Sequence, residues 1–141
     1  AALDLVTSLN DQDIPIHGIG FQGHIDVRGP GRNRMAKACE EASGMGLLIH
    51  ISELDISINP GGKTDIVLQN RFNDQASMYE MVAEVYGTNV PVDQQFGITI
   101  WGVNDADSWI PSFFGRVDAP LLWDDNYRAK PALCGFINGL D

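Results

Sequence analysis

The sequence has few of the features that mark nucleic-acid-binding or membrane-spanning proteins. Only 9 of its 141 residues are Lys or Arg, against 19 Asp or Glu, and the formal net charge is −10. Because phosphate backbones and anionic membranes attract cationic surfaces, we expect neither nucleic acid nor membrane as a partner. No apolar run approaches the roughly 18 residues that a transmembrane helix needs, and no secretory leader is recognisable at the start.

Cysteine is scarce as well, and a nucleotide-binding loop is missing. Cys39 and Cys134 have no metal-type spacing. A disulfide between them stays open, although two separate buried thiols is the favoured interpretation. Gly18 and Gly20 lie within a predicted strand and lack the rest of a phosphate-binding fingerprint. The opening without Met, already in the middle of a helical pattern, predicts a chain cut from a larger one.

The central feature is a near-continuous apolar run, Leu47–Ile58, bounded by glycines before it and by Asn-Pro-Gly-Gly after it. Such a run predicts a buried parallel strand. Side chains alternate along a strand, so four are expected to share one face: Ile49, Ile51, Glu53 and Asp55. His50 is then expected on the opposite, helix-facing side. The two acids either form a site or are solvated where the strand meets the loop, and this run alone does not decide between them.

Strands and helices alternate along the rest of the chain. The patterns predict strands over residues 16–25, 47–58 and 96–103, and helices over 1–10, 33–42, 73–86 and 132–140. The third helix is expected to be capped by Asn73 or Asp74. A long polar and aromatic loop, 104–126, separates the last strand from the last helix, and its acids, such as Asp105, are interpreted as turn and solvation residues. This alternation is typical of a parallel α/β sheet in a single domain.

The candidate functional side chains all lie where a predicted strand ends. Gln22 and His24 are two residues apart and face the same way, Glu53 and Asp55 end the central strand, and Trp101 ends the third. In parallel α/β folds this edge of the sheet is where sites are built. A carboxylate beside an indole, with a histidine to orient it, suits sugar chemistry, because glycosidases need an ionised carboxylate at an oxocarbenium-like centre.

Four motifs appear in order and carry a family resemblance. They are Gly18-Ile-Gly-Phe-Gln-Gly-His24, Ile51-Ser-Glu-Leu-Asp-Ile56, Ile98-Thr-Ile-Trp-Gly-Val103 with Asp107-Ser-Trp109, and Pro120-Leu-Leu-Trp-Asp-Asp-Asn-Tyr-Arg-Ala-Lys-Pro131. Together they resemble the carboxyl-terminal part of glycoside hydrolase family 10, the retaining endo-β-1,4-xylanases. The resemblance implies an α/β fold, a fragment of a (β/α)8 TIM barrel with strands six to eight and their helices, so that residues 1–141 form an incomplete catalytic domain.

The same resemblance implies catalytic roles. Glu53 stands at the position of the nucleophile, His24 at that of the histidine that hydrogen-bonds it, and Asp55 is expected to hold that histidine. The alternatives are a solvated acid at the strand end for Glu53, a satisfied core histidine for His24 and a loop cap for Asp55. No metal and no organic cofactor are expected.

Substrate contacts are implied for three more residues. Gln22 is expected to contact sugar, and Trp101 and Trp109 to form the platform and lid of the subsites next to the cleaved bond. Packing roles remain the alternative for both tryptophans. The partner expected is xylan, met by a secreted or cell-surface enzyme.

The acid/base glutamate of the family is not among the motifs of this chain. A retaining glycosidase needs two carboxyl groups about 5 to 5.5 Å apart, and the second would come from the missing amino-terminal part of the barrel. Two alternatives therefore stay open: a catalytically inactive fragment with weak glycan binding, and a related glycosidase that cleaves β-glucans. We expect no hydrolysis by these 141 residues alone.

Overall fold

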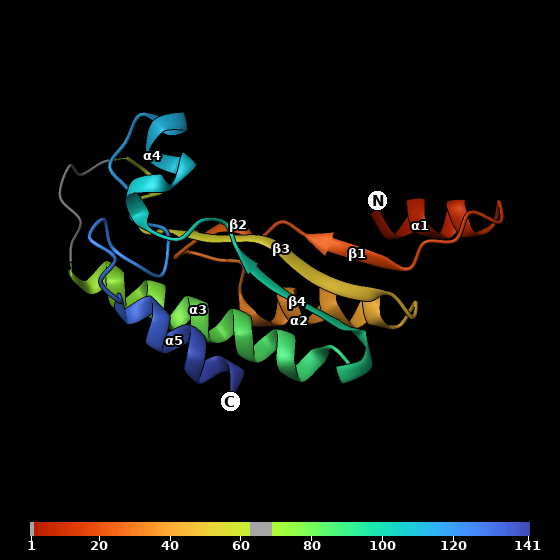
Figure 1. Cartoon of the computed structure of the whole chain (residues 1–141). Helices are drawn as coiled ribbons and strands as arrows, with labels where there is room; N and C mark the ends of the chain where they lie inside the picture. Colours follow the sequence, from red (N-terminus) through yellow and green to blue (C-terminus); the bar gives the residue numbers. More distant parts are fainter. Residues whose placement is uncertain (1, 63–68) are drawn as a thin grey trace.

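A computed structural model describes residues 2–62 and 69–141 (Figure 1). The order of elements is α1 (Ala2–Asn10), β1 (Gly18–Phe21), β2 (His24–Asp26), α2 (Arg32–Ser43), β3 (Leu48–Ser57), α3 (Gln69–Asn89), η1 (Val92–Gln94), β4 (Gln95–Ile100), η2 (Asp105–Asp107), α4 (Trp109–Phe114) and α5 (Pro131–Leu140). No helix of these two ranges is long and apolar enough to cross a membrane.

The sheet is parallel and is organised around β3. β1 and β2 pair with successive parts of β3, with Gly18 opposite Leu48 and His24 opposite Asp55, while β4 pairs with β3 from Ile49 to Leu54. All strands therefore end at one edge of the sheet, the edge near which α4 lies in Figure 1. The prediction of a parallel α/β sheet is confirmed.

The first predicted strand is interrupted where one continuous strand was expected. β1 ends at Phe21 and β2 begins at His24, and Gly23 between them has φ +85°. An added Cβ at Gly23 would lie 3.1 Å from the Ile51 side chain, so this position favours glycine for its conformation and for space.

β3 also departs from strict alternation, and the face expected for its acids is wrong. The pairing with β4 shifts register between Ile51 and Leu54. Ile49 and Ile51 therefore join Leu54 and Ile56 in the hydrophobic core, whereas Glu53 bonds to His24 outside that core. An irregularity of one residue moves every later side chain to the other face.

His50 likewise lies on the side opposite to the one expected. Its Nε2 is 2.9 Å from Thr99 Oγ1, and its ring lies 4.9 Å from the ring of Phe96, which is two-thirds exposed. Because the neighbouring Ile49 points into the core, His50 faces away from the helices.

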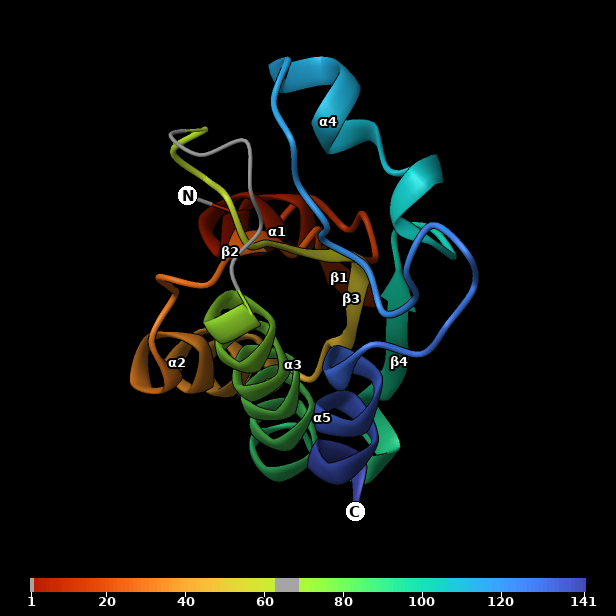
Figure 2. The same cartoon turned by 90° about the vertical axis from the view of Figure 1, so that its left-hand side faces the viewer.

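Three helices, α2, α3 and α5, cover one face of the sheet (Figures 1 and 2). α3 and α5 pack closely through glycine: a Cβ added at Gly135 would lie 2.2 Å from the carbonyl oxygen of Ala76. α3 begins before the expected caps, since Asn73 and Asp74 lie inside it, and it continues through Gly87 to Asn89. Tertiary packing of its buried side chains, such as Tyr79, extends the helix beyond its local signals.

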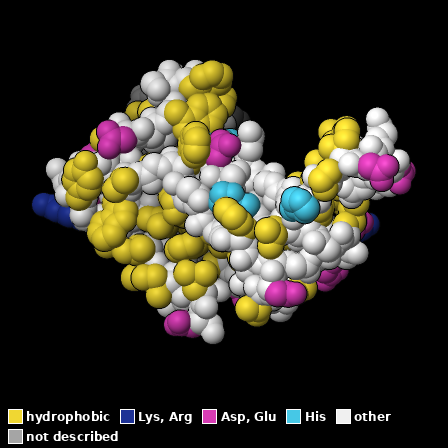
Figure 3. Space-filling model, turned by 45° about the vertical axis from the view of Figure 1, so that its right-hand side comes forward, with side chains coloured by type: hydrophobic (Ala, Val, Ile, Leu, Met, Phe, Trp, Pro, Cys, Tyr) yellow, Lys and Arg dark blue, Asp and Glu magenta, His cyan; other side chains and the backbone are white. Residues whose placement is uncertain are grey.

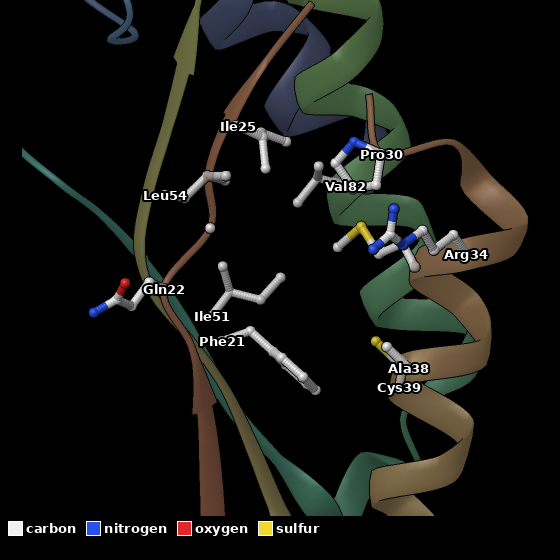
Figure 4. Close-up of a pocket in the computed structure, with 12 residues that line it drawn as sticks. Phe21, Gln22, Ile25, Pro30, Arg34, Ala38, Cys39, Ile51, Leu54 and Val82 are labelled. Atoms are coloured by element: carbon white, nitrogen blue, oxygen red, sulfur yellow. The ribbon is translucent and has the colours of Figure 1, made fainter. Parts of the chain in front are cut away.

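A cavity of about 290 Å³ lies between the strands and the helices α2 and α3. Figure 4 shows apolar side chains pointing into it, among them Phe21 and Ile51 from the strand side and Val82 from α3, and shows Gln22 pointing away from the helices. Cys39 lines this cavity and is buried, whereas Cys134 is exposed; both are free thiols. The expectation of two buried thiols is therefore wrong for Cys134.

The long loop after β4 contains a buried ion pair that was not expected. Lys130 Nζ lies 2.7 Å from Asp105 Oδ2, and both residues are 6% exposed. Asp105 is thus a structural residue of the interior, because its other oxygen also accepts the backbone N–H of Leu121 at 2.8 Å. Asp124 is a turn residue as expected, accepting the N–H groups of Asn126 and Arg128.

Candidate active site

His24 and Glu53 meet at the carboxyl edge of the sheet, next to the gap between β1 and β2. His24 Nε2 lies 3.1 Å from Glu53 Oε2, and each side chain is 25% exposed. The backbone N–H of Glu53 donates to the carbonyl of Gln22 at 2.8 Å, so the strand pairing itself holds Glu53 beside the Gln22–His24 segment. The structure brings together the two side chains that the sequence placed on neighbouring strands.

Asp55 lies on the other side of the same imidazole. Its Oδ2 is 2.9 Å from His24 Nδ1, and the Cα atoms of the two residues are partners in the pairing of β2 with β3. Asp55 is completely buried. Burial raises the pKa of the Asp55 carboxyl, and hydrogen bonds from Trp109 and His24 act in the opposite direction.

When a histidine lies between two carboxylates, the protonation of its two ring nitrogens decides which hydrogen bonds it can donate. When both ring nitrogens carry protons, the imidazolium donates to Asp55 and to Glu53 together, and both acids stay ionised. Loss of one proton leaves a lone pair facing an ionised carboxylate, which is unfavourable. The arrangement is therefore suited to holding the Glu53 carboxyl group in a fixed direction.

The two tryptophans approach this group from different elements. Trp101 follows β4, is 45% exposed, and its ring lies 6.3 Å from the His24 ring at 74°. Trp109 begins α4, lies 5.2 Å from the His24 ring at 66°, and donates its indole N–H to Asp55 Oδ2 at 2.8 Å. The contact between Trp109 and Asp55 was not anticipated, because a tryptophan in a long loop carries no sequence signal for its partner.

A hollow next to the acids is open to solvent. It is lined by His24, Asp55, Trp109 and Phe114, with Arg116 at its side. Figure 3 shows histidine side chains in the depression between two raised ends of the molecule, with exposed hydrophobic side chains on the end that carries α4. Gln22 is exposed and points away from the helices (Figure 4). Apolar rings beside polar groups are the combination that binds a sugar ring.

A second polar network, missed by the sequence analysis, holds the end of β3. Asp118 is buried and accepts the N–H of Ile58 at 2.9 Å and the hydroxyl of Ser57. Arg116 reaches the same Asp118 and Ser57. These groups fix the chain two residues beyond Asp55. Within residues 2–62 and 69–141, no three His, Cys, Asp or Glu side chains are grouped as metal ligands would be.

Acids joined by a histidine at the carboxyl edge of a parallel sheet, with indoles beside them, are typical of carbohydrate hydrolases of the α/β-barrel class. A family model described as glycosyl hydrolase family 10 matches residues 1–138. The chain belongs to this family.

Relatives and solved structures agree with the family. Endo-beta-1,4-xylanase Xyn10C of Cellvibrio japonicus is 33% identical over 98% of this chain and 25% of its own length. Endo-1,4-beta-xylanase B of Thermotoga neapolitana is 35% identical over 91% of this chain and 35% of its own length.

The structure of native xylanase10C from Cellvibrio japonicus superposes with a TM-score of 0.94 at 33% identity, covering 99% of this chain and 32% of that one. A mutant of the same xylanase, solved in complex with xylopentaose, gives a TM-score of 0.93. The fold is thus a part of a (β/α)8 barrel, the part with strands six to eight, as expected. The chain spans about a quarter to a third of the length of these relatives.

Proposed function

We propose that residues 1–141 are the carboxyl-terminal part of the catalytic barrel of a retaining endo-β-1,4-xylanase that hydrolyses xylan, with Glu53 as nucleophile. The observation that carries this proposal is the contact of His24 with both Glu53 and Asp55, at 3.1 and 2.9 Å, at the sheet edge where barrel enzymes hold their sites. Relatives named as endo-β-1,4-xylanases support the choice of substrate.

Each proposed role follows from position. Glu53 attacks the anomeric carbon to form a glycosyl-enzyme, and water then releases the sugar with retained configuration. His24 donates to Glu53 and keeps it ionised, and Asp55 holds the second ring nitrogen of His24. Gln22 contacts sugar hydroxyls, and Trp101 offers its exposed face to a pyranose ring.

The second carboxyl comes from outside these residues. The general acid/base stands about 5 to 5.5 Å from the nucleophile in a retaining enzyme, so we place it on a strand in the amino-terminal part of the barrel. The segment alone is then inactive. A polymeric substrate implies that the enzyme acts outside the cell, at the surface or after secretion.

The test uses the longest reading frame that contains residues 1–141, called here the complete protein. We expect release of xylo-oligosaccharides from xylan, with retention at the anomeric carbon by NMR, and loss of at least about 10³-fold in kcat on Glu53→Gln. A 2-deoxy-2-fluoro xylobioside with a good leaving group should label the peptide that holds Glu53.

Two outcomes would contradict the proposal: xylan hydrolysis that survives Glu53→Gln, or a complete protein without any Glu53-dependent hydrolysis of xylan. Parallel assays on carboxymethyl cellulose and mixed-linkage β-glucan test the alternative of a β-glucan-cleaving enzyme, for which those polymers would be cleaved faster than xylan. The isolated segment serves as the inactive control.

A further inference from the structure

Among residues 2–62 and 69–141, the side chain of Asp55 has two hydrogen-bond partners, the indole N–H of Trp109 and the imidazole of His24. Trp109 Nε1 lies 2.8 Å from Asp55 Oδ2, the same oxygen that lies 2.9 Å from His24 Nδ1. The other oxygen, Oδ1, is buried and has no hydrogen-bond partner in the part of the chain that the structure describes. Asp55 is therefore a fully buried carboxyl that depends on a histidine and an indole.

The indole is itself held in place from several sides. Ser108 caps the short helix α4, its hydroxyl accepting the N–H of Ile110 at 3.2 Å, and so fixes the backbone next to Trp109. The ring packs edgewise against His24 at 5.2 Å and lies tilted against Phe113 and Phe114 at 5.2 and 5.6 Å. The helix cap at Ser108 and the ring contacts with His24, Phe113 and Phe114 together direct the indole N–H at Asp55.

Removal of this donor acts on Glu53 through two intermediates. An ionised, buried carboxylate is costly unless hydrogen bonds compensate for the lost water. Without the indole N–H, Asp55 takes up a proton more readily and becomes a weaker partner for His24 Nδ1. The imidazole is then held less firmly, and the hydrogen bond by which it orients Glu53 weakens.

We propose that Trp109 is a positioning residue of this site, which orients the nucleophile Glu53 through Asp55 and His24 in addition to any contact with sugar. This inference rests on the proposed function for its kinetic readout. It connects α4 to the nucleophile through Asp55 and His24, because the first residue of α4, Trp109, donates its indole N–H to Asp55.

The test replaces the indole in the complete protein in two ways. Trp109→Phe removes the N–H and part of the ring, and site-specific incorporation of 3-benzothienylalanine at 109 replaces only the N–H by sulfur and keeps the shape. For both variants we expect kcat to fall about tenfold, KM to change less than about threefold, and the acid limb of the kcat/KM profile to move to higher pH. The sign follows because the lost donor favours the protonated form of Asp55, whose ionised form holds His24.

A double-mutant cycle separates positioning from sugar contact. In an Asp55→Asn background, loss of the Trp109 N–H should change kcat by less than about twofold, since its target is already altered. Independent effects of the two changes, or a large rise in KM with an unchanged pH profile, would overturn the proposal and leave Trp109 as a sugar contact only.

A readout without turnover keeps this test separate from that of the proposed function. NMR of the Asp55 carboxyl carbon should show a higher pKa for Asp55 in both Trp109 variants than in the unchanged protein, because the indole N–H bonded to Asp55 lowers that pKa. An unchanged Asp55 pKa would overturn the inference whatever the substrate. Absence of Glu53-dependent hydrolysis together with a raised Asp55 pKa would contradict the proposed function alone.

Discussion

Replacing Lys130 by Met should destabilise the protein more than any surface substitution. Lys130 Nζ lies 2.7 Å from Asp105 Oδ2 and 2.7 Å from each of the carbonyl oxygens of Ala119 and Leu121, so all three of its protons are used in the interior. Met fills a similar volume but leaves Asp105 as an unpaired buried charge. Removal of one partner of a buried pair costs about 3–5 kcal/mol, which is the loss expected here.

The pH dependence of this loss follows from the same burial. Burial raises the pKa of Asp105 above its usual 3.8 and lowers the pKa of Lys130. Burial therefore disfavours the charged form of each residue, and the opposite charge of the partner counteracts this effect. A raised pKa in the folded state adds stability at low pH, which is lost as pH rises through that pKa. Without Lys130 the pKa of Asp105 rises further. The cost of Lys130→Met should therefore be largest at neutral pH and shrink as the solution is acidified.

Urea unfolding of the complete protein, followed by tryptophan fluorescence at pH 7 and at pH 5, measures both effects. A matched double variant, Lys130→Met with Asp105→Asn, removes the charge and keeps an oxygen for the N–H of Leu121, so it should be at least about 1.5 kcal/mol more stable than Lys130→Met at pH 7. The reasoning would be refuted by a cost below about 1 kcal/mol, or by a double variant no more stable than the single one.

The remaining predictions concern packing and thiol exposure. Gly135→Ala should lower the free energy of unfolding by about 1–3 kcal/mol, because its Cβ would lie 2.2 Å from the carbonyl oxygen of Ala76. Gly87→Ala, whose Cβ meets nothing within 4 Å inside the same α3–α5 layer, is the matched control and should raise stability by up to about 1 kcal/mol through helix propensity. Equal effects of the two would contradict the packing argument. In a thiol titration of the folded protein, Cys134 should react at once and Cys39 only on unfolding, since Cys39 is buried and burial raises its pKa; two fast thiols would contradict this burial.

Much of the site was predictable because the ends of parallel strands can be located from short sequence patterns. A strand read from its apolar run ends at a known edge, so Glu53, Asp55 and His24 could be placed together from their positions at strand ends. The structure brings these three together at hydrogen-bond distance. Their catalytic roles stay predictions.

Other features could not be read from the order of residues. The register shift between Ile51 and Leu54 turns Glu53 away from the core, and it depends on pairing with β4, more than 40 residues away along the chain. The helix-facing assignment of His50 was wrong for the same reason, since strict alternation was assumed on each side of that shift.

The sequence by itself determined the main helices, the parallel sheet, the family motifs and the edge at which the acids lie, because each depends on short-range periodicity and on residue chemistry. It did not determine η2 and α4, which lie in the segment 104–126 that was predicted as a loop. Only the tertiary structure decided that Trp109 donates to Asp55 and that Asp105 pairs with Lys130 inside the protein. Those contacts join residues 54 and 25 positions apart. They form because packing excludes water from polar groups, which must then find partners wherever the fold brings them, and no local pattern records that choice.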